Sequence, residues 1–215
     1  MQPANDPNVN YRALVQRGYD LCAASYEEAR QGEANPELDF LTRRLANGAY
    51  VLDIGCGAGV PIARKLAQRF HVTGIDSSGE QIRRARMKVP TGRFIQGDIM
   101  WATFPPASFD AAIAYYTVFH LPREEHPELL RRIYRWLKPG GCLLATVALS
   151  AAVGYTEDDF FGTTMYWSHY GLDEYEAILT EIGFELLETT VIGHGYRPEK
   201  QAPPERHPLI LAQVT

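Results

Sequence analysis

The stretch that decides the fold is VLDIGCGAGVP, which runs from Val51 to Pro61. It begins as an apolar strand and continues through three glycines at alternate positions into a segment with helical apolar spacing. Because glycine has no Cβ, such a turn lets backbone N–H groups and the positive end of a helix dipole approach a ligand closely. The stretch predicts a binding loop for a nucleotide-like ligand.

The acid in front of the loop and the glycine spacing narrow the ligand. A dinucleotide fingerprint needs GxGxxG, and Gly55 and Gly57 fit it, but the third position is Val60, with Gly59 one residue early. Asp53 would repel a pyrophosphate and attract an ammonium or a sulfonium group. We therefore expect a ligand that carries positive charge.

Strand-length apolar runs alternate with segments of helical periodicity from residue 50 onward, the pattern of a doubly wound α/β sheet. We expect strands at 50–54, 71–75, 93–96, 109–114 and 142–148, and helices near 60–69, 79–88 and 123–137. Ser78 and Gln81 have the spacing of a capping box that opens the second of these helices.

Beyond residue 148 the sequence becomes aromatic and is broken by glycines, which predicts a loop or short-helix cover over 149–172. A helix near 173–182 and strands near 185–192 and 207–214 complete the expected elements.

Two further acids follow predicted strands. Asp76 ends the second strand, where a carboxylate can accept hydrogen bonds from both hydroxyls of a ribose. Asp98 follows the third strand and can accept a hydrogen bond from an exocyclic amino group such as that of adenine. Together with Asp53, these acids describe adenosine joined to a cationic amino-acid tail.

The motifs VLDIGCGAGVP, VTGIDSS, GDI, FDAAIAYYTVFHL and LKPGG, in this order, resemble those of class I S-adenosylmethionine-dependent methyltransferases. The resemblance is strong over about residues 40–148 and loose elsewhere. It implies a Rossmann-like doubly wound seven-stranded sheet, mostly parallel with an antiparallel last strand, which residues 207–214 fit. It also implies S-adenosyl-L-methionine as the cofactor and S-adenosyl-L-homocysteine as its product.

The resemblance carries over to individual cofactor-binding positions, namely Tyr26, Asp53, Gly55, Cys56, Gly57, Gly59, Asp76, Ser77, Asp98, Ile99, Ala114 and Tyr115. It implies that the loop Gly55–Gly59 packs against the methionine part, with Asp53 at or near the ammonium. The carbonyl of Ala114 would also accept from the ammonium, and Tyr115 would lie beside the methyl donor.

The adenosine end follows from the same resemblance. Asp76 would hold the ribose, and Ser77 would lie by the adenine, whose amino group Asp98 and the Ile99 backbone would bind. An aromatic residue of the N-terminal helix, Tyr19 or Tyr26, would cover the cofactor.

With 215 residues and 46% hydrophobic content, the chain fits one domain with one substantial core. Within this single methyltransferase domain we expect an N-terminal helical cap at 1–45 and a cofactor-binding core at 46–148. A substrate cover at 149–172 and a sheet completion at 173–215 would follow.

Two histidines are candidates for a general base, which methyl transfer to a hydroxyl or ammonium group would need. His120 follows the fourth strand, near the expected donor methyl, although a histidine satisfied by backbone groups would fit there equally well. His169 lies in the aromatic cover, which could shield a small substrate or be ordinary core packing.

Composition bounds the partners. The net charge of −5 gives no global attraction to nucleic acid, and the chain has AYYT where nucleic-acid amino methyltransferases of this fold carry Asn/Asp-Pro-Pro-aromatic. The sequence shows no spacing of metal ligands, no membrane-length apolar run and no signal-like start, and its three cysteines are widely spaced. We expect a cytoplasmic protein with a small-molecule substrate, whose oligomeric state the sequence leaves open.

The leading hypothesis is methyl transfer from S-adenosylmethionine to an oxygen, nitrogen or other nucleophile of a small molecule, by in-line displacement. A nicotinamide-dependent oxidoreductase is one alternative, which Asp76 permits and Val60 and Asp53 disfavour. A non-catalytic S-adenosylmethionine-binding protein is the other.

Overall fold

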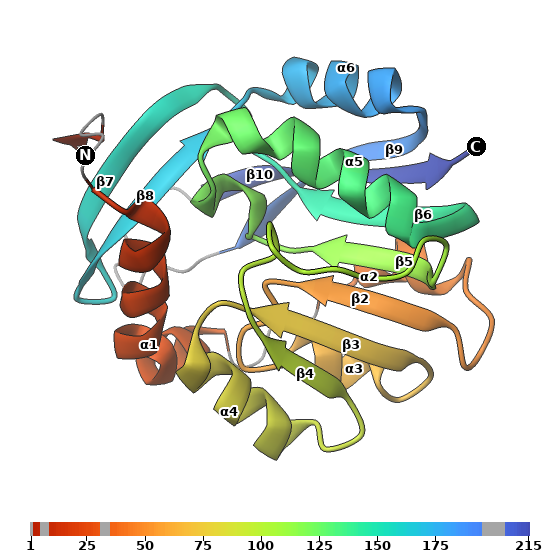
Figure 1. Cartoon of the computed structure of the whole chain (residues 1–215), viewed down its shortest axis with the longest axis horizontal. Coiled ribbons are helices and arrows are strands. Elements are labelled where there is room, and N and C mark those ends of the chain that lie inside the picture. The colour runs from red at the N-terminus through yellow and green to blue at the C-terminus, as the bar shows by residue number, and fades with distance from the viewer. Residues whose placement is uncertain (1, 5–8, 31–34, 195–204) are drawn as a thin grey trace.

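The computed structural model describes residues 2–4, 9–30, 35–194 and 205–215. The described residues form a seven-stranded sheet of order β4-β3-β2-β5-β6-β10-β9 and a small sheet of order β1-β7-β8, in which β1 is Gln2–Pro3 (Figure 1).

The large sheet contains β2 (Tyr50–Ile54), β3 (His71–Asp76), β4 (Arg93–Gln96), β5 (Phe109–Ala114), β6 (Leu137–Thr146), β9 (Phe184–His194) and β10 (Glu205–Val214). The helices are α1 (Tyr11–Ala29), α2 (Leu38–Thr42), α3 (Ile62–Leu66), α4 (Gly79–Lys88), α5 (His126–Trp136) and α6 (Leu172–Ile182). Two short 3-10 helices, η1 (Val118–His120) and η2 (Arg123–Glu125), precede α5.

The pairing confirms the predicted sheet. Strands β2 to β6 pair in parallel, and β10 pairs antiparallel with both β6 and β9. Several expected strands match within one or two residues, whereas the helix expected at 60–69 extends only over Ile62–Leu66.

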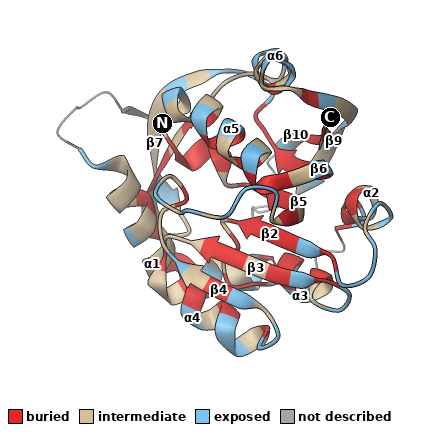
Figure 2. Ribbon diagram, turned by 45° about the vertical axis from the view of Figure 1, so that its right-hand side comes forward, coloured by how far each residue is buried: buried red, intermediate tan, exposed pale blue. Residues whose placement is uncertain are grey.

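Side chains of the central strands alternate between two cores, one on each face of the sheet. Val51 packs in the core under α2, α3 and α4, and Leu52 and Ile54 pack in the core under α5 and α6. Figure 2 shows the central strands as buried over most of their length. This two-sided burial confirms the doubly wound architecture and explains why these strands are apolar on both faces.

The expectation of a loop or short-helix cover over 149–172 was wrong. Strands β7 (Ala152–Phe160) and β8 (Thr163–His169) form an antiparallel hairpin in this region. Its two-residue turn places Phe161 at φ 52° and Gly162 at φ 78°, the positive angles of a type I′ turn. Gly154 lies inside β7, where a Cβ would be 3.2 Å from the carbonyl oxygen of Ala4. The glycines that indicated a loop therefore serve a hairpin turn and a close approach within the small sheet.

Helix α1 lies beyond the carboxyl ends of β2 and β3, between the hairpin and α4 (Figure 1). It packs closely on β8, because a Cβ on Gly18 would be 2.9 Å from the Met165 side chain. Within the described part of the chain, every helix is too short or too polar to span a lipid bilayer.

The capping box expected at the start of α4 is only half formed. The Ser78 hydroxyl accepts a hydrogen bond from the Gln81 backbone N–H at 3.1 Å, as an N-cap should. The reciprocal bond is absent among the described residues, because the Ser78 N–H donates instead to the Asp76 carboxylate at 2.9 Å.

Candidate active site

A cavity of about 480 Å³ opens at the carboxyl ends of β2, β3 and β5, with α1 forming one wall. The chain winds from β2 to β4 on one side and continues through β5 and β6 on the other, so the cavity lies where the strand order reverses. Ligands of open α/β sheets bind at this topological position. The volume lies within the range of small-molecule and cofactor sites.

Most residues predicted from the sequence meet in this cavity. The lining residues among them are Tyr26, Asp53, Gly55, Cys56, Gly57, Asp76, Ser77, Asp98, Ile99, Tyr115 and His120. Gly59 and Ala114 lie outside the lining that the described residues define. A Cβ on Gly59 would be 3.3 Å from that of Ala85, so this glycine packs on α4, and Ala114 is buried within β5. Their cofactor contacts stay predictions.

Asp53, near the end of β2, is only 2% exposed. Its Oδ2 atom has no hydrogen-bond partner within the described residues. Burial, with a smaller contribution from the charge of Asp76, raises the pKa of Asp53 to about 7, while Arg30 opposes the shift. A buried carboxylate of this kind is stabilised in its charged form by a cationic donor.

Asp76 ends β3 and is held by backbone donors on both oxygens. Oδ2 accepts from the Gly57 N–H at 2.9 Å, and Oδ1 accepts from the Ser78 N–H at 2.9 Å. Burial raises the pKa of Asp76 to about 6 against the effect of these two donors. Each carboxylate oxygen keeps a further acceptor site, so the group can still bind hydroxyls.

Gly55 makes the turn out of β2 possible. Its φ is +68°, and a Cβ there would be 2.0 Å from the Thr117 hydroxyl oxygen. Thr117 lies in the segment after β5 and donates to the Ile54 carbonyl at 2.9 Å, which ties the two strand ends together. Thr117 also lines the cavity, a position that the sequence analysis missed because no motif marks it.

Asp98 also lines the cavity but is engaged by protein groups. Its Oδ1 accepts from the Met100 N–H at 2.8 Å, and its Oδ2 pairs with the guanidinium of Arg12 from α1. Arg12 also pairs with Glu125. The structure therefore adds an arginine to the site that sequence reasoning did not identify.

His120 lines the cavity and has one ring nitrogen satisfied by a backbone carbonyl, while its role as a general base stays a prediction. Its Nδ1 lies 2.9 Å from the Tyr166 carbonyl oxygen, which can only accept, so Nδ1 carries the proton. Its Nε2 therefore accepts from the Tyr19 hydroxyl at 2.8 Å. Burial lowers the pKa of His120 to about 4 and raises the pKa of Tyr19 well above its ordinary value. The pair is thus neutral near pH 7, and both residues line the cavity.

His169 lies elsewhere. It is on β8 outside the cavity lining, and its ring is nearly perpendicular to that of Tyr155 at 6.2 Å between centroids. Burial lowers the pKa of His169. The structure does not bring it together with the other candidates, and its catalytic role stays a prediction.

Comparison with known proteins gives the family. A family model described as a methyltransferase domain matches residues 51–141. The 27-O-demethylrifamycin SV methyltransferase of Amycolatopsis mediterranei is 32% identical over 195 residues, which cover 81% of this chain and 70% of that protein. The chain belongs to the class I S-adenosylmethionine-dependent methyltransferase family.

Two further comparisons are informative. A trans-aconitate 2-methyltransferase of Deinococcus radiodurans is 35% identical over 155 residues, or 65% of this chain and 57% of that protein. The structure of the 1,6-didemethyltoxoflavin-N1-methyltransferase of Burkholderia thailandensis shares the fold, with a TM-score of 0.71 and 22% identity over 99% of this chain and 94% of that one. The chain spans less than two thirds of the length of several curated relatives that it matches, and only 25% of a sterol 24-C-methyltransferase of Neurospora crassa.

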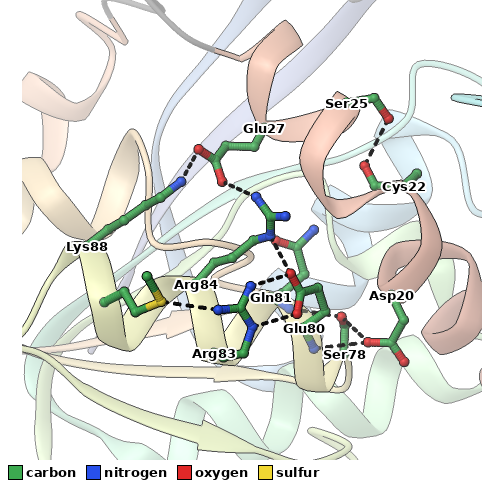
Figure 3. A network of polar contacts seen from close by, with 11 residues as sticks. Asp20, Cys22, Ser25, Glu27, Ser78, Glu80, Gln81, Arg83, Arg84 and Lys88 are labelled. Atoms are coloured by element: carbon green, nitrogen blue, oxygen red, sulfur yellow. Dashed lines mark hydrogen bonds and ion pairs between the residues drawn. The ribbon is translucent and has the colours of Figure 1, made fainter.

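In this family member, a polar network fastens the α1 wall to α4 (Figure 3). Asp20 accepts from the Ser78 hydroxyl at 2.6 Å and from the Glu80 N–H at 3.1 Å. About two turns further along α1, Glu27 pairs with Arg84 at 3.2 Å and with Lys88. The network holds α1 over the cavity through side chains that are mostly only partly exposed.

The residues present fit the cofactor of the family. The buried Asp53 Oδ2, unpartnered in the ranges that the structure describes, is an acceptor suited to an α-ammonium group, and Asp76 retains acceptor capacity for a ribose. Asp98 could bind an adenine amino group only by sharing its carboxylate with Arg12. The acids lie at or just beyond the carboxyl ends of neighbouring parallel strands, and this explains why the sequence could place them at one edge of the sheet.

Proposed function

We propose that this chain catalyses methyl transfer from S-adenosylmethionine to an oxygen, nitrogen or other nucleophilic atom of a small molecule. The observation that carries the proposal is a single cavity that joins Asp53 and Asp76 to the neutral Tyr19–His120 pair. When bound, S-adenosylmethionine supplies an activated methyl group on a sulfonium. The protein then has to orient an acceptor, exclude water and, for some acceptors, remove a proton.

The proton route follows from the hydrogen bonds of His120. As the acceptor loses its proton to the Tyr19 oxygen, the Tyr19 proton passes to His120 Nε2, and the resulting imidazolium keeps its Nδ1–H on the Tyr166 carbonyl. The depressed pKa of His120 makes it a weak base, so this route serves an acceptor that becomes more acidic as its bond to the methyl group forms. In this proposal Tyr19 contacts the acceptor and His120 acts through it.

The similar proteins do not indicate which atom accepts the methyl group, because their names specify carbon, oxygen and nitrogen acceptors. Support for a small molecule in place of nucleic acid comes from the net charge of −5 and from the AYYT sequence after β5. The cysteines Cys22, Cys56 and Cys142 are free and buried, which suits our further proposal of a cytoplasmic location.

The test begins with calorimetric titration of the protein with S-adenosylhomocysteine and, separately, with oxidised nicotinamide dinucleotide. Micromolar binding of the first ligand, followed by methyl transfer to a member of a panel of phenols, amines, thiols and carboxylic acids, would support the proposal. Binding of the dinucleotide alone would favour the oxidoreductase alternative. Binding of S-adenosylhomocysteine without transfer to any acceptor class would favour a non-catalytic binding protein.

The Tyr19–His120 pair has its own test in the same assay. Tyr19→Phe should lower kcat by about tenfold or more, as loss of general base catalysis does, and change the Kd of S-adenosylhomocysteine by less than about twofold. Tyr50→Phe is the matched control, because Tyr50 is 52% exposed and lies outside the cavity lining of the described residues. Equal kcat values for the wild type and Tyr19→Phe would remove the pair from the mechanism.

A further inference from the structure

Aromatic rings gather at the Tyr19–His120 pair. The Tyr19 ring is nearly perpendicular to that of His120, with 5.3 Å between the centroids, and it lies 5.3 Å from the ring of Tyr26. The ring of Trp167 lies 4.3 Å from that of His120, with 38° between the planes. Tyr19, Tyr26 and His120 line the cavity. An acceptor that contacts the Tyr19 hydroxyl therefore meets aromatic side chains.

Tyr116, two residues beyond β5, is a further ring of the cavity wall, and the contacts derived above do not use it. The residue is buried, and its φ is +54°, in the left-handed region that residues with a Cβ rarely adopt. Its N–H donates to the hydroxyl of the fully buried Thr146 at 2.6 Å, which holds the backbone in this conformation. Because enforced conformations of this kind cluster at functional sites, Tyr116 is a candidate for a ligand contact.

Arg30 supplies positive charge to the same wall. It is buried and lines the cavity, and its guanidinium lies over the ring of Tyr26 at 5.7 Å and over the ring of Tyr116 at 5.4 Å. Burial raises the pKa of Tyr19, Asp76 adds to the rise, and the charge of Arg30 opposes it, so the field of Arg30 reaches the Tyr19 hydroxyl. Arg30 therefore stabilises negative charge on an acceptor oxygen at that hydroxyl.

Ring contacts continue without a break from Tyr116 to Tyr26. The Tyr116 ring lies 6.2 Å from that of Phe119, which lies 5.4 Å from that of Trp167. The Phe160 ring lies 5.4 Å from that of Trp167 and 5.9 Å from that of Tyr26. These rings come from the segment after β5 and from η1, β8, β7 and α1. Segments far apart in sequence thus meet in one aromatic wall.

This wall discriminates between classes of acceptor. A flat aromatic compound gains stacking and edge-to-face contacts with the rings, whereas a saturated compound does not. A cationic amine is disfavoured, because the Arg30 guanidinium already lies over both tyrosine faces and would repel a second cation.

The proton route favours one kind of aromatic compound. The depressed pKa of His120 makes the Tyr19–His120 pair a weak base, which suits a hydroxyl that is itself acidic. A phenol has a pKa of about 10, as the tyrosine side chain does, and is far more acidic than an alkyl alcohol. The charge of Arg30 further favours the phenolate that forms as the proton leaves.

We propose that the acceptor is a phenol, whose ring packs against Tyr116 and Tyr26 with its hydroxyl at Tyr19, and that Tyr116 determines this specificity. The phenol oxygen forms a bond to the methyl carbon as the bond from that carbon to the sulfonium sulfur breaks. The phenol proton passes to the Tyr19 oxygen and the Tyr19 proton to His120 Nε2, which leaves an aryl methyl ether and S-adenosylhomocysteine. This inference rests on the proposed function, because it names the substrate class of the same site.

The first test measures methyl transfer by the wild type from S-adenosylmethionine with a radiolabelled methyl group. The acceptors are phenol, catechol and 2-naphthol, each beside its saturated alcohol, with 2-naphthylmethylamine as an aromatic cation. For the best phenol we expect a kcat/KM at least about tenfold above that of its saturated partner and that of the amine.

The second test examines Tyr116 with the best phenol. Tyr116→Leu removes the ring and should raise the KM of the phenol about tenfold, whereas Tyr116→Phe keeps the ring and should hold the KM within about twofold of the wild type. Both variants should keep the Kd of S-adenosylhomocysteine within about twofold, because Tyr116 contacts the acceptor in this proposal. Tyr50→Leu, at a half-exposed tyrosine outside the cavity lining of the described residues, is the matched control and should change neither constant.

Several results would overturn the inference. Equal rates for a phenol and its saturated alcohol, or for a phenol and the amine, would remove the aromatic selection, and transfer to thiols or carboxylic acids with none to phenols would contradict the substrate class. An unchanged KM in Tyr116→Leu, or an equal loss in Tyr116→Phe, would remove the role of Tyr116. The wild-type comparison decides the substrate class even where Tyr116→Leu does not fold, and Tyr116→Phe then decides the role of the residue. Failure of the proposed function is distinct, since the wild type would then not bind S-adenosylhomocysteine or would methylate no class of acceptor.

Discussion

The ionisation of Asp53 should make cofactor binding depend on pH. Burial raises the pKa of this carboxyl to about 7 in the ligand-free protein, so near neutral pH it is partly protonated. An ammonium group beside it favours the ionised form. Binding of S-adenosylhomocysteine should therefore release a proton, and the affinity should fall as the pH decreases through 7.

The size of the effect follows from the pKa. With a value of about 7, roughly 90% of Asp53 is ionised at pH 8 and roughly 10% at pH 6, so the Kd should weaken about tenfold between these pH values, or about 1.4 kcal/mol. Asp76, with a pKa of about 6, adds about a further twofold at pH 6 if its ionised form is the better acceptor for the ribose.

Calorimetric titration at pH 6, 7 and 8, in two buffers of different ionisation enthalpy, measures both the Kd and the number of protons released. The control is Asp53→Asn, which should bind more weakly at pH 8 and show a much flatter pH profile, and which subtracts any titration of the ligand itself. A wild-type Kd that changes by less than twofold between pH 6 and 8 would refute the reasoning. So would a tenfold slope that persists in Asp53→Asn.

Other variants test the loop, the buried acid and the α1 wall. Gly55→Ala should lower the free energy of unfolding by about 3 kcal/mol or more, because its Cβ would overlap Thr117 at a φ of +68°. The control Gly140→Ala, with φ +75° and no atom within 4 Å of its Cβ, should lose only about 1 to 2 kcal/mol. Equal losses in urea unfolding would contradict the clash. A carboxyl whose folded pKa is raised contributes stability below its unfolded pKa and loses it as the pH rises through the folded value. The free energy of unfolding of Asp53→Asn should therefore gain about 2 to 3 kcal/mol over that of the wild type between pH 5 and pH 8. A constant difference between the two proteins would argue against the raised pKa. Glu27→Gln should weaken S-adenosylhomocysteine binding a few-fold at low salt and reduce the salt dependence of its Kd, since two ion pairs to α4 are lost. Identical salt profiles of the Kd for the variant and the wild type would show that these pairs do not support the α1 wall.

The elements that sequence patterns predicted well are those with local or repeating causes. Strands β2 and β5 are short apolar runs buried on both faces, and α4 begins at a serine that caps it. The prediction for residues 152–169, which form a hairpin, failed because their glycines were interpreted as loop residues. The positive φ of Gly162 and the close approach at Gly154 depend on pairing between strands, which single-residue signals do not contain.

Side-chain partners distant in sequence were outside the reach of motif analysis. His120 meets Tyr19, which lies 101 positions earlier, and the Tyr166 carbonyl, 46 positions later. Its neutral state and its tautomer follow from these contacts and from burial. The sequence could only place it near the end of β5.

By itself, the sequence determined the positions of the strands that precede the cavity, the glycine turn and the three acids of the cavity. These features depend on apolar periodicity, on the absence of a Cβ and on the rule that parallel strands end at one edge of the sheet. Only the tertiary structure decided that Arg12 pairs with Asp98, that the Thr117 side chain packs where a Cβ on Gly55 would lie, and that the Gln81 amide lines the cavity. These outcomes depend on which hydrogen-bond partners and which free volume the packed elements bring together, and no local pattern of residues specifies them.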